Sequence, residues 1–101
     1  MGITLDDHGN LYIADQLNHR IRRVNATTGV IETIAGTGTI GQLGGYYLGD
    51  GTPATEAFLD RPAAVSIDNN GNLLIADAGN HLLRRVNTKT GIIKTITALR
   101  R

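Results

Sequence analysis

Hydrophobic positions along the chain come in short runs, and polar or glycine-rich turns separate these runs every few residues. β-Branched and aliphatic side chains fill the runs, which is typical of short β-strands. No run keeps the period of an amphipathic helix over several turns. The pattern therefore predicts an all-β protein.

One stretch of this pattern occurs twice in the sequence. Residues 9–15 (Gly-Asn-Leu-Tyr-Ile-Ala-Asp) return as residues 71–77 (Gly-Asn-Leu-Leu-Ile-Ala-Asp), an offset of 62 positions (71 minus 9). At this offset, residues 3–37 and 65–99 are identical at 18 of 35 positions. Such a period indicates a repeat architecture in which each copy is one supersecondary unit.

Each copy predicts four short strands joined by three hairpins. In the first copy these strands cover residues 2–6, 11–15, 20–25 and 30–35. Turn clusters separate them at residues 6–10 and 26–29, and the second copy carries the turn-forming Asn70-Gly71 pair at the corresponding place. Residues 11–15 and 73–77 are apolar without polar alternation, as expected of strands covered on both faces. The sheets are therefore expected to stack.

A long connection separates the two copies and sets the predicted boundaries. Residues 1–35 form the first unit, residues 36–62 the connection and residues 63–101 the second unit. Glycines crowd the first two thirds of the connection, and Pro53 stands near the start of one predicted helical turn. A connection of this length in a small domain is either functional or mobile.

Composition narrows the classes of function. The 101 residues contain 10 Lys+Arg and 9 Asp+Glu, a net charge of +1, so nucleic acid is not an expected partner. The absence of cysteine excludes disulfides and cysteine-based metal sites. The chain shows neither an apolar run of membrane-spanning length nor a signal-peptide pattern. No membrane association is expected, and two locations stay open: the protein is cytoplasmic, which is the default, or a signal has been removed from it.

Several motifs together resemble a known repeat family. Residues 18–25 read Asn-His-Arg-Ile-Arg-Arg-Val-Asn, residues 80–82 read Asn-His-Leu, and residues 49–55 read Gly-Asp-Gly-Thr-Pro-Ala-Thr. This pattern resembles the NHL repeat over nearly the whole chain. The resemblance implies that each copy is one four-stranded antiparallel blade of a β-propeller, a fold that usually has about six blades in this family.

Two blades alone do not close a propeller ring. We expect apolar residues at both ends of the two-blade stack to be exposed, namely Leu11, Ile13, Leu73 and Ile75. Because repeats bury their faces only against neighbouring repeats, cyclic self-association is the simplest way to cover the exposed end faces. Three chains would complete a six-bladed homotrimer.

The resemblance also implies a binding face. Loops between blades and loops between second and third strands open on the same face of a propeller, which is the usual binding surface. Tyr46 and Tyr47 in the connection would then offer aromatic contacts to a protein or peptide, unless they pack on their own blade. The candidates contributed by the blades themselves are Asn18, His19, Asn80 and His81.

No metal or cofactor site is predicted. His19 and His81 are weak candidate metal ligands, but histidine belongs to the ordinary pattern of the resembled family, and a structural hydrogen bond is the favoured interpretation. Asp15 and Asp77 are expected to cap backbone N–H groups of the following loop. Residues 36–41 fit a Gly-x-Gly-x-x-Gly pattern but do not open a helix, so no nucleotide is expected.

The leading hypothesis is a binding or scaffold module that recognises protein or peptide on its top face and associates with itself. One alternative is a metal-dependent lyase or hydrolase with a site in the central channel, because propellers resembling this one include such enzymes. Another is an engineered or ancestral-like building block with no selected ligand, which the similarity of the two copies favours.

Overall fold

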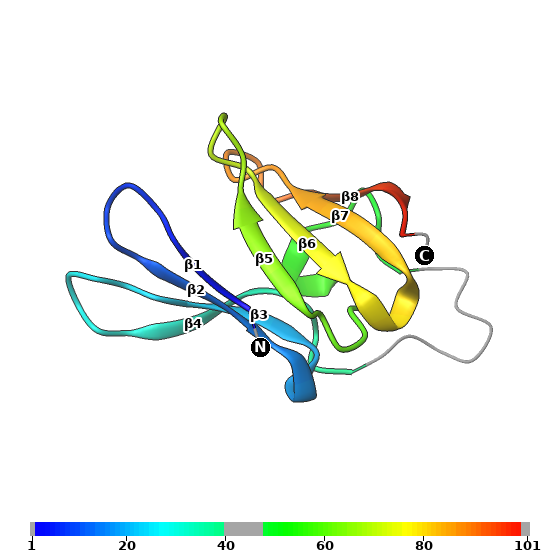
Figure 1. The fold of residues 1–101 in the computed structure, drawn as a ribbon, viewed down its shortest axis with the longest axis horizontal. Coiled ribbons are helices and arrows are strands. Elements are labelled where there is room, and N and C mark those ends of the chain that lie inside the picture. Colours follow the sequence, from blue (N-terminus) through cyan, green and yellow to red (C-terminus); the bar gives the residue numbers. More distant parts are fainter. Residues whose placement is uncertain (1, 40–47, 100–101) are drawn as a thin grey trace.

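The computed structural model describes residues 2–39 and 48–99 and contains two four-stranded antiparallel sheets (Figure 1). In each sheet the strand order follows the chain, so every neighbouring pair is a hairpin. The prediction of an all-β protein with two four-stranded antiparallel units is confirmed. The first sheet, called blade 1, contains β1 (Ile3–Leu5), β2 (Leu11–Asp15), β3 (Arg20–Val24) and β4 (Ile31–Ala35). The second, called blade 2, contains β5 (Ala64–Ile67), β6 (Leu73–Asp77), β7 (Leu82–Val86) and β8 (Ile93–Ala98).

An aspartate holds the first turn of each blade. The Asp6 carboxylate accepts hydrogen bonds from the backbone N–H groups of His8 and Asn10, both at 2.9 Å, and from the Tyr12 hydroxyl at 3.2 Å. Partial burial alone would raise the pKa of Asp6, but these bonds and one from the Asn10 side chain lower that pKa below its ordinary value. Gly9 closes the turn at φ 83°, a conformation that glycine adopts without strain.

Residues 48–62, called the linker segment, run along the outer edge of blade 2. Gly51 N–H donates to the Ile93 carbonyl at 2.8 Å, and Ile93 N–H donates to the Thr52 carbonyl at 3.1 Å. The predicted helical turn is the 3-10 turn η2 (Ala54–Glu56), with Pro53 at its N-cap. Helices in the described ranges are single turns of this kind, and none of them is long and apolar enough to cross a membrane.

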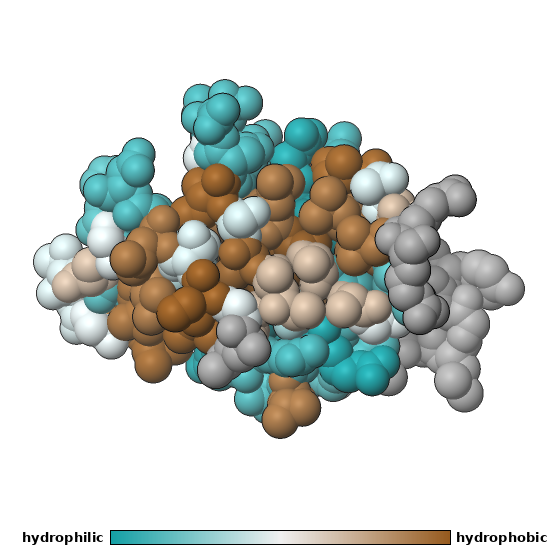
Figure 2. Space-filling model, viewed as in Figure 1, coloured by the Kyte–Doolittle hydropathy of each residue, from teal (hydrophilic) through white to brown (hydrophobic). Residues whose placement is uncertain are grey.

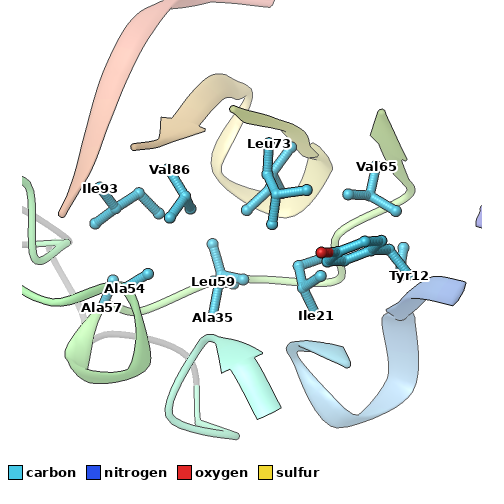
Figure 3. Close-up of a cluster of buried hydrophobic side chains, with 12 residues drawn as sticks. Tyr12, Ile21, Ala35, Ala54, Ala57, Leu59, Val65, Leu73, Val86 and Ile93 are labelled. Atoms are coloured by element: carbon cyan, nitrogen blue, oxygen red, sulfur yellow. The ribbon is translucent and has the colours of Figure 1, made fainter. Parts of the chain in front are cut away.

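The hydrophobic core lies between the two blades. Figure 3 shows Leu59 of the linker segment between Ala35 of blade 1 and Leu73 of blade 2. Burial of apolar area is the main favourable term in folding, so this shared core is what joins the blades. Its members are Tyr12, Ala14, Ile21, Ala35, Ala54, Ala57, Leu59, Val65, Leu73, Ile75, Val86 and Ile93.

The two blades stack head to tail, so equivalent residues face the same direction. Leu73 and Ile75 of β6 are only 1% and 0% exposed because their face of blade 2 is turned toward blade 1. The prediction that they lie exposed at an end of the stack is therefore wrong. Their equivalents Leu11 and Ile13 belong to the face of blade 1 that is turned away from blade 2, where both are partly buried.

That outward face of blade 1, called the open face, carries exposed apolar side chains. Ile3 and Leu5 are 62% and 63% exposed, and Ile31 is 55% exposed. Figure 2 shows hydrophobic side chains gathered over blade 1 and the neighbouring strands β5 and β6. By strand register, the open face comprises Ile3, Leu5, Leu11, Ile13, Asp15, Arg20, Arg22, Val24, Ile31 and Thr33.

Candidate functional site

The β2–β3 and β6–β7 connections lie at one end of the molecule, opposite the β1–β2 and β5–β6 turns (Figure 1). Each is a 3-10 turn, η1 (Gln16–Asn18) or η3 (Ala78–Asn80), and each ends on a histidine with left-handed backbone. His19 has φ 56° and His81 has φ 58°. The sequence Asp-x-x-Asn-His thus builds the same polar turn twice.

Asp15 and Asp77 do not cap these turns as predicted. Neither turn has a side-chain capping bond, and both carboxylates instead accept from the asparagine at the end of the turn. Asn18 Nδ2 lies 3.1 Å from each carboxylate oxygen of Asp15, and Asn80 Nδ2 lies 2.9 Å from Asp77 Oδ2. The physical reason is that the short turn presents the asparagine amide, and not a backbone N–H, to the carboxylate.

His19 fastens the linker segment to blade 1. Its Nδ1 accepts a hydrogen bond from Arg61 N–H at 3.0 Å, and the same nitrogen lies 3.8 Å from Asp60 Oδ1. Arg61 has φ 47°, an uncommon conformation for a residue with a side chain, which this bond helps to hold. The Nδ1 lone pair is thereby used in a structural hydrogen bond, which was the favoured interpretation of His19.

His81 is exposed and lines a shallow cavity of about 200 Å³ at the same end. The other lining residues are Gln16, Arg61, Ala78 and Gly79. The structure thus brings both polar turns to one surface with Arg61 between them. Tyr46 and Tyr47, the predicted aromatic contacts, lie outside the described residues.

A metal centre has no support from the geometry of the described part of the chain. Within residues 2–39 and 48–99, no group of three or more His, Cys, Asp or Glu side chains lies close enough to hold an ion. His19 and His81 therefore do not gain the further ligands that zinc requires from this part of the chain.

A buried polar network centred on Arg84 is the feature that the sequence did not predict. Arg84 is 0% exposed, and its Nη1 donates to the Phe58 carbonyl at 2.8 Å and to Asp77 Oδ2 at 3.3 Å. Its Nη2 donates to the Leu48 carbonyl at 2.9 Å and to Asp50 Oδ1 at 2.8 Å. The guanidinium thus fixes both ends of the linker segment against blade 2.

Asp77 completes this network under strong desolvation. Its Oδ1 accepts a hydrogen bond from Asp60 N–H at 2.8 Å, so Asp77 also holds the C-terminal end of the linker segment. Burial raises the pKa of the Asp77 carboxyl, although Asn80, Asp60 N–H and Arg84 act against this shift. Asp50 shows the opposite net result: burial raises its pKa, but contacts with Thr95 and Arg84 outweigh burial and lower it.

Two four-stranded sheets stacked head to tail, each carrying Asp-x-x-Asn-His after its second strand, define neighbouring blades of a propeller-like fold. Residues 59–85 match the NHL repeat family, so the predicted resemblance to this family is confirmed. NHL repeat-containing protein 2 of Bos taurus is 32% identical over 102 residues, which cover 99% of this chain and 13% of that protein. The chloroplastic protein SUPPRESSOR OF QUENCHING 1 of Arabidopsis thaliana is 33% identical over 91 residues, or 90% of this chain and 8% of that protein.

Solved structures show the same fold. A structural genomics protein of unknown function from Bacteroides thetaiotaomicron superposes with a TM-score of 0.67 at 24% identity, over 86% of this chain and 20% of that chain. Virginiamycin B lyase from Staphylococcus aureus superposes with a TM-score of 0.63 at 20% identity, over 95% of this chain and 26% of that chain. The chain thus spans only a small part of the length of each of these proteins.

Proposed function

We propose that this chain is a two-blade scaffold module that associates with further copies into a closed propeller, with three chains forming six blades. The exposure of Ile3 and Leu5 on the open face is the observation that carries this proposal. Contiguous apolar side chains on a sheet face favour burial against a neighbouring element.

The junction inside the chain is a template for the junction between chains. There, Tyr12, Ala14 and Ile21 of blade 1 pack in one core with Val65, Leu73 and Ile75 of blade 2. In blade 2, the residues at the repeat offset from Tyr12, Ala14 and Ile21 are available to pack against a second copy. The open face of that copy offers the residues at the repeat offset from Val65, Leu73 and Ile75. The first set is Leu74, Ala76 and Leu83, which are partly buried in one chain, and the second set is Ile3, Leu11 and Ile13.

We expect a solution mass of three chains, and we expect Leu5→Asp to reduce it to one chain. A carboxylate at this position would be buried without a partner in the assembly but would stay solvated in the single chain. Light scattering behind a sizing column at several concentrations measures this mass. Leu17→Asp is the matched control, since Leu17 is 85% exposed and lies in η1, off the open face. A mass of one chain for the unaltered protein would contradict the proposal.

The end of the molecule with the two polar turns is our candidate binding surface for protein or peptide. Asn18, His19, Asn80 and His81 lie there, and a ring would repeat this set around its axis. Exposed turns on a rigid repeat scaffold are well suited to binding because the scaffold fixes their geometry.

We expect a peptide array probed with the chain to give signals that His81→Ala weakens. The exposed Thr90 lies in the β7–β8 turn, away from the polar turns, so Thr90→Ala should leave the signals unchanged. An array without signals, or signals that respond equally to both variants, would contradict a peptide-binding surface at this end.

A further inference from the structure

The face of blade 2 that is turned toward blade 1 works as a receptor for the linker segment. Its outer strand pairs with the segment through Ile93, its buried Arg84 binds Asp50 and two main-chain carbonyls, and its Asp77 accepts from Asp60 N–H. Main-chain pairing, charge and apolar burial therefore together hold the linker segment on blade 2.

Blade 1 carries the same receptor residues in the same register. Arg22, Asp15 and Ile31 of the open face stand at the positions of Arg84, Asp77 and Ile93. Thr33 likewise stands where Thr95 contacts Asp50. The duplication therefore supplies two receptors, whereas the Gly-Asp-Gly-x-Pro-Ala sequence of the linker segment occurs once.

The receptor on blade 1 has no segment on it in the described part of the chain. The Arg22 and Asp15 side chains are 33% and 22% exposed, with Arg22 Nη1 at 3.6 Å from Asp15 Oδ2. The equivalent pair in blade 2 is fully buried. Ile31 is 55% exposed where Ile93 is 0% exposed, and the described linker segment leaves the Ile31 edge of β4 uncovered.

We infer that the outer half of the open face, formed by Asp15, Arg22, Val24, Ile31 and Thr33, docks a second segment of the linker type, supplied by an adjoining NHL repeat. The segment would pair with β4 through the main-chain groups of Ile31 and would place an aspartate on the Arg22 guanidinium. In the proposed ring each linker segment is held by its own blade 2, so the docked segment would come from a repeat outside the three chains of the ring. The docking is also tested separately from the ring, because Ile3 and Leu5 of β1 lie outside the docking residues.

One difference between the two receptors limits the length of the docked segment. Gly79 lies so close to the linker segment that a Cβ atom added there would be 2.2 Å from Asp60 Cγ. The equivalent position in blade 1 is Leu17. A segment on blade 1 must therefore leave the course of the linker segment after the position of Phe58, and residues 48–58 are the part that both receptors can hold.

The test is a titration of a synthetic peptide of residues 48–58 into the full chain carrying Leu5→Asp, followed by amide chemical shifts. The signals of Arg22 and Ile31 should move with the peptide. Arg22→Met should weaken binding about tenfold or more, because it removes a charge-assisted hydrogen bond. The peptide with Asp50→Asn should bind equally weakly, and combining both changes should add little further loss. Arg85→Met is the matched control, since Arg85 is exposed and belongs to the other blade.

A second measurement detects docking that is too weak to follow with the free peptide. Residue 64 is the repeat equivalent of residue 2, so a second copy of residues 48–63 joined directly to Gly2 places the segment beside blade 1. This extension should raise the urea midpoint of the Leu5→Asp chain, and Arg22→Met should abolish the gain. Binding that Arg22→Met leaves intact, or no peptide shifts together with no gain from the extension, would overturn the inference. Both results are independent of whether the unaltered chain forms a ring.

Discussion

Arg84→Met is expected to lower the free energy of unfolding by about 3–5 kcal/mol, because breaking a buried ion pair on one side leaves the other charge uncompensated. The methionine keeps most of the side-chain volume, so the loss reports on charge and hydrogen bonds. Asp77 would remain fully buried beside the change, and the carbonyls of Leu48 and Phe58 would lose their donor. Urea unfolding of the Leu5→Asp chain measures the effect without a contribution from association.

The internal duplication provides the control for this prediction. Arg22→Met alters the equivalent residue on the open face, where Arg22 and its neighbour Asp15 both keep contact with water. An exposed pair of this kind contributes at most about 1 kcal/mol. Equal losses for Arg22→Met and Arg84→Met would contradict the role assigned to burial.

The pH dependence separates a charge effect from lost packing. The folded pKa of Asp77 already lies above its ordinary value of 3.8, and removing Arg84 should raise it further. The penalty for the buried carboxylate is then complete above the raised pKa and disappears as the pH falls toward 3.8. The deficit of Arg84→Met should therefore shrink on acidification, whereas a deficit caused by packing alone would not change with pH.

Local structure was largely predictable from the sequence because each strand and turn depends on nearby residues. The four strands of blade 1 and β6 of blade 2 fall close to the predicted ranges, and Pro53 stands at the start of the predicted helical turn. The Asp-x-x-Asn-His sequence likewise produces the same 3-10 turn and left-handed histidine in both blades. Equal local sequences give equal local geometry.

The environment of a residue was not predictable in this way. Arg22 and Arg84 each follow an aliphatic residue and precede Arg-Val-Asn, yet one is partly exposed and the other is buried. The difference arises because the linker segment covers only one of the two equivalent faces. The wrong prediction for Leu73 and Ile75 has a similar cause, because the repeat pattern does not show which face of a blade its neighbour will cover.

Leu59→Ala is expected to cost about 2–5 kcal/mol, the usual range for truncating a fully buried leucine. Leu59 is 0% exposed and lies between Ala35 of blade 1 and Leu73 of blade 2 (Figure 3). Domains of this size have a total stability of about 5–15 kcal/mol, so the loss would be a large fraction of it. Leu17→Ala is the control, because Leu17 is 85% exposed and should change stability by no more than about 0.5 kcal/mol.

The position of Leu59 also predicts how this loss is distributed. Since its side chain is shared by both blades, Leu59→Ala should accelerate hydrogen exchange together in β2 and β3 of blade 1 and in β6 and β7 of blade 2. Native-state exchange of the Leu5→Asp chain, with and without Leu59→Ala, measures this directly. Faster exchange in blade 2 alone would mean that Leu59 stabilises its own blade and that other core residues, such as Tyr12 and Val65, join the two.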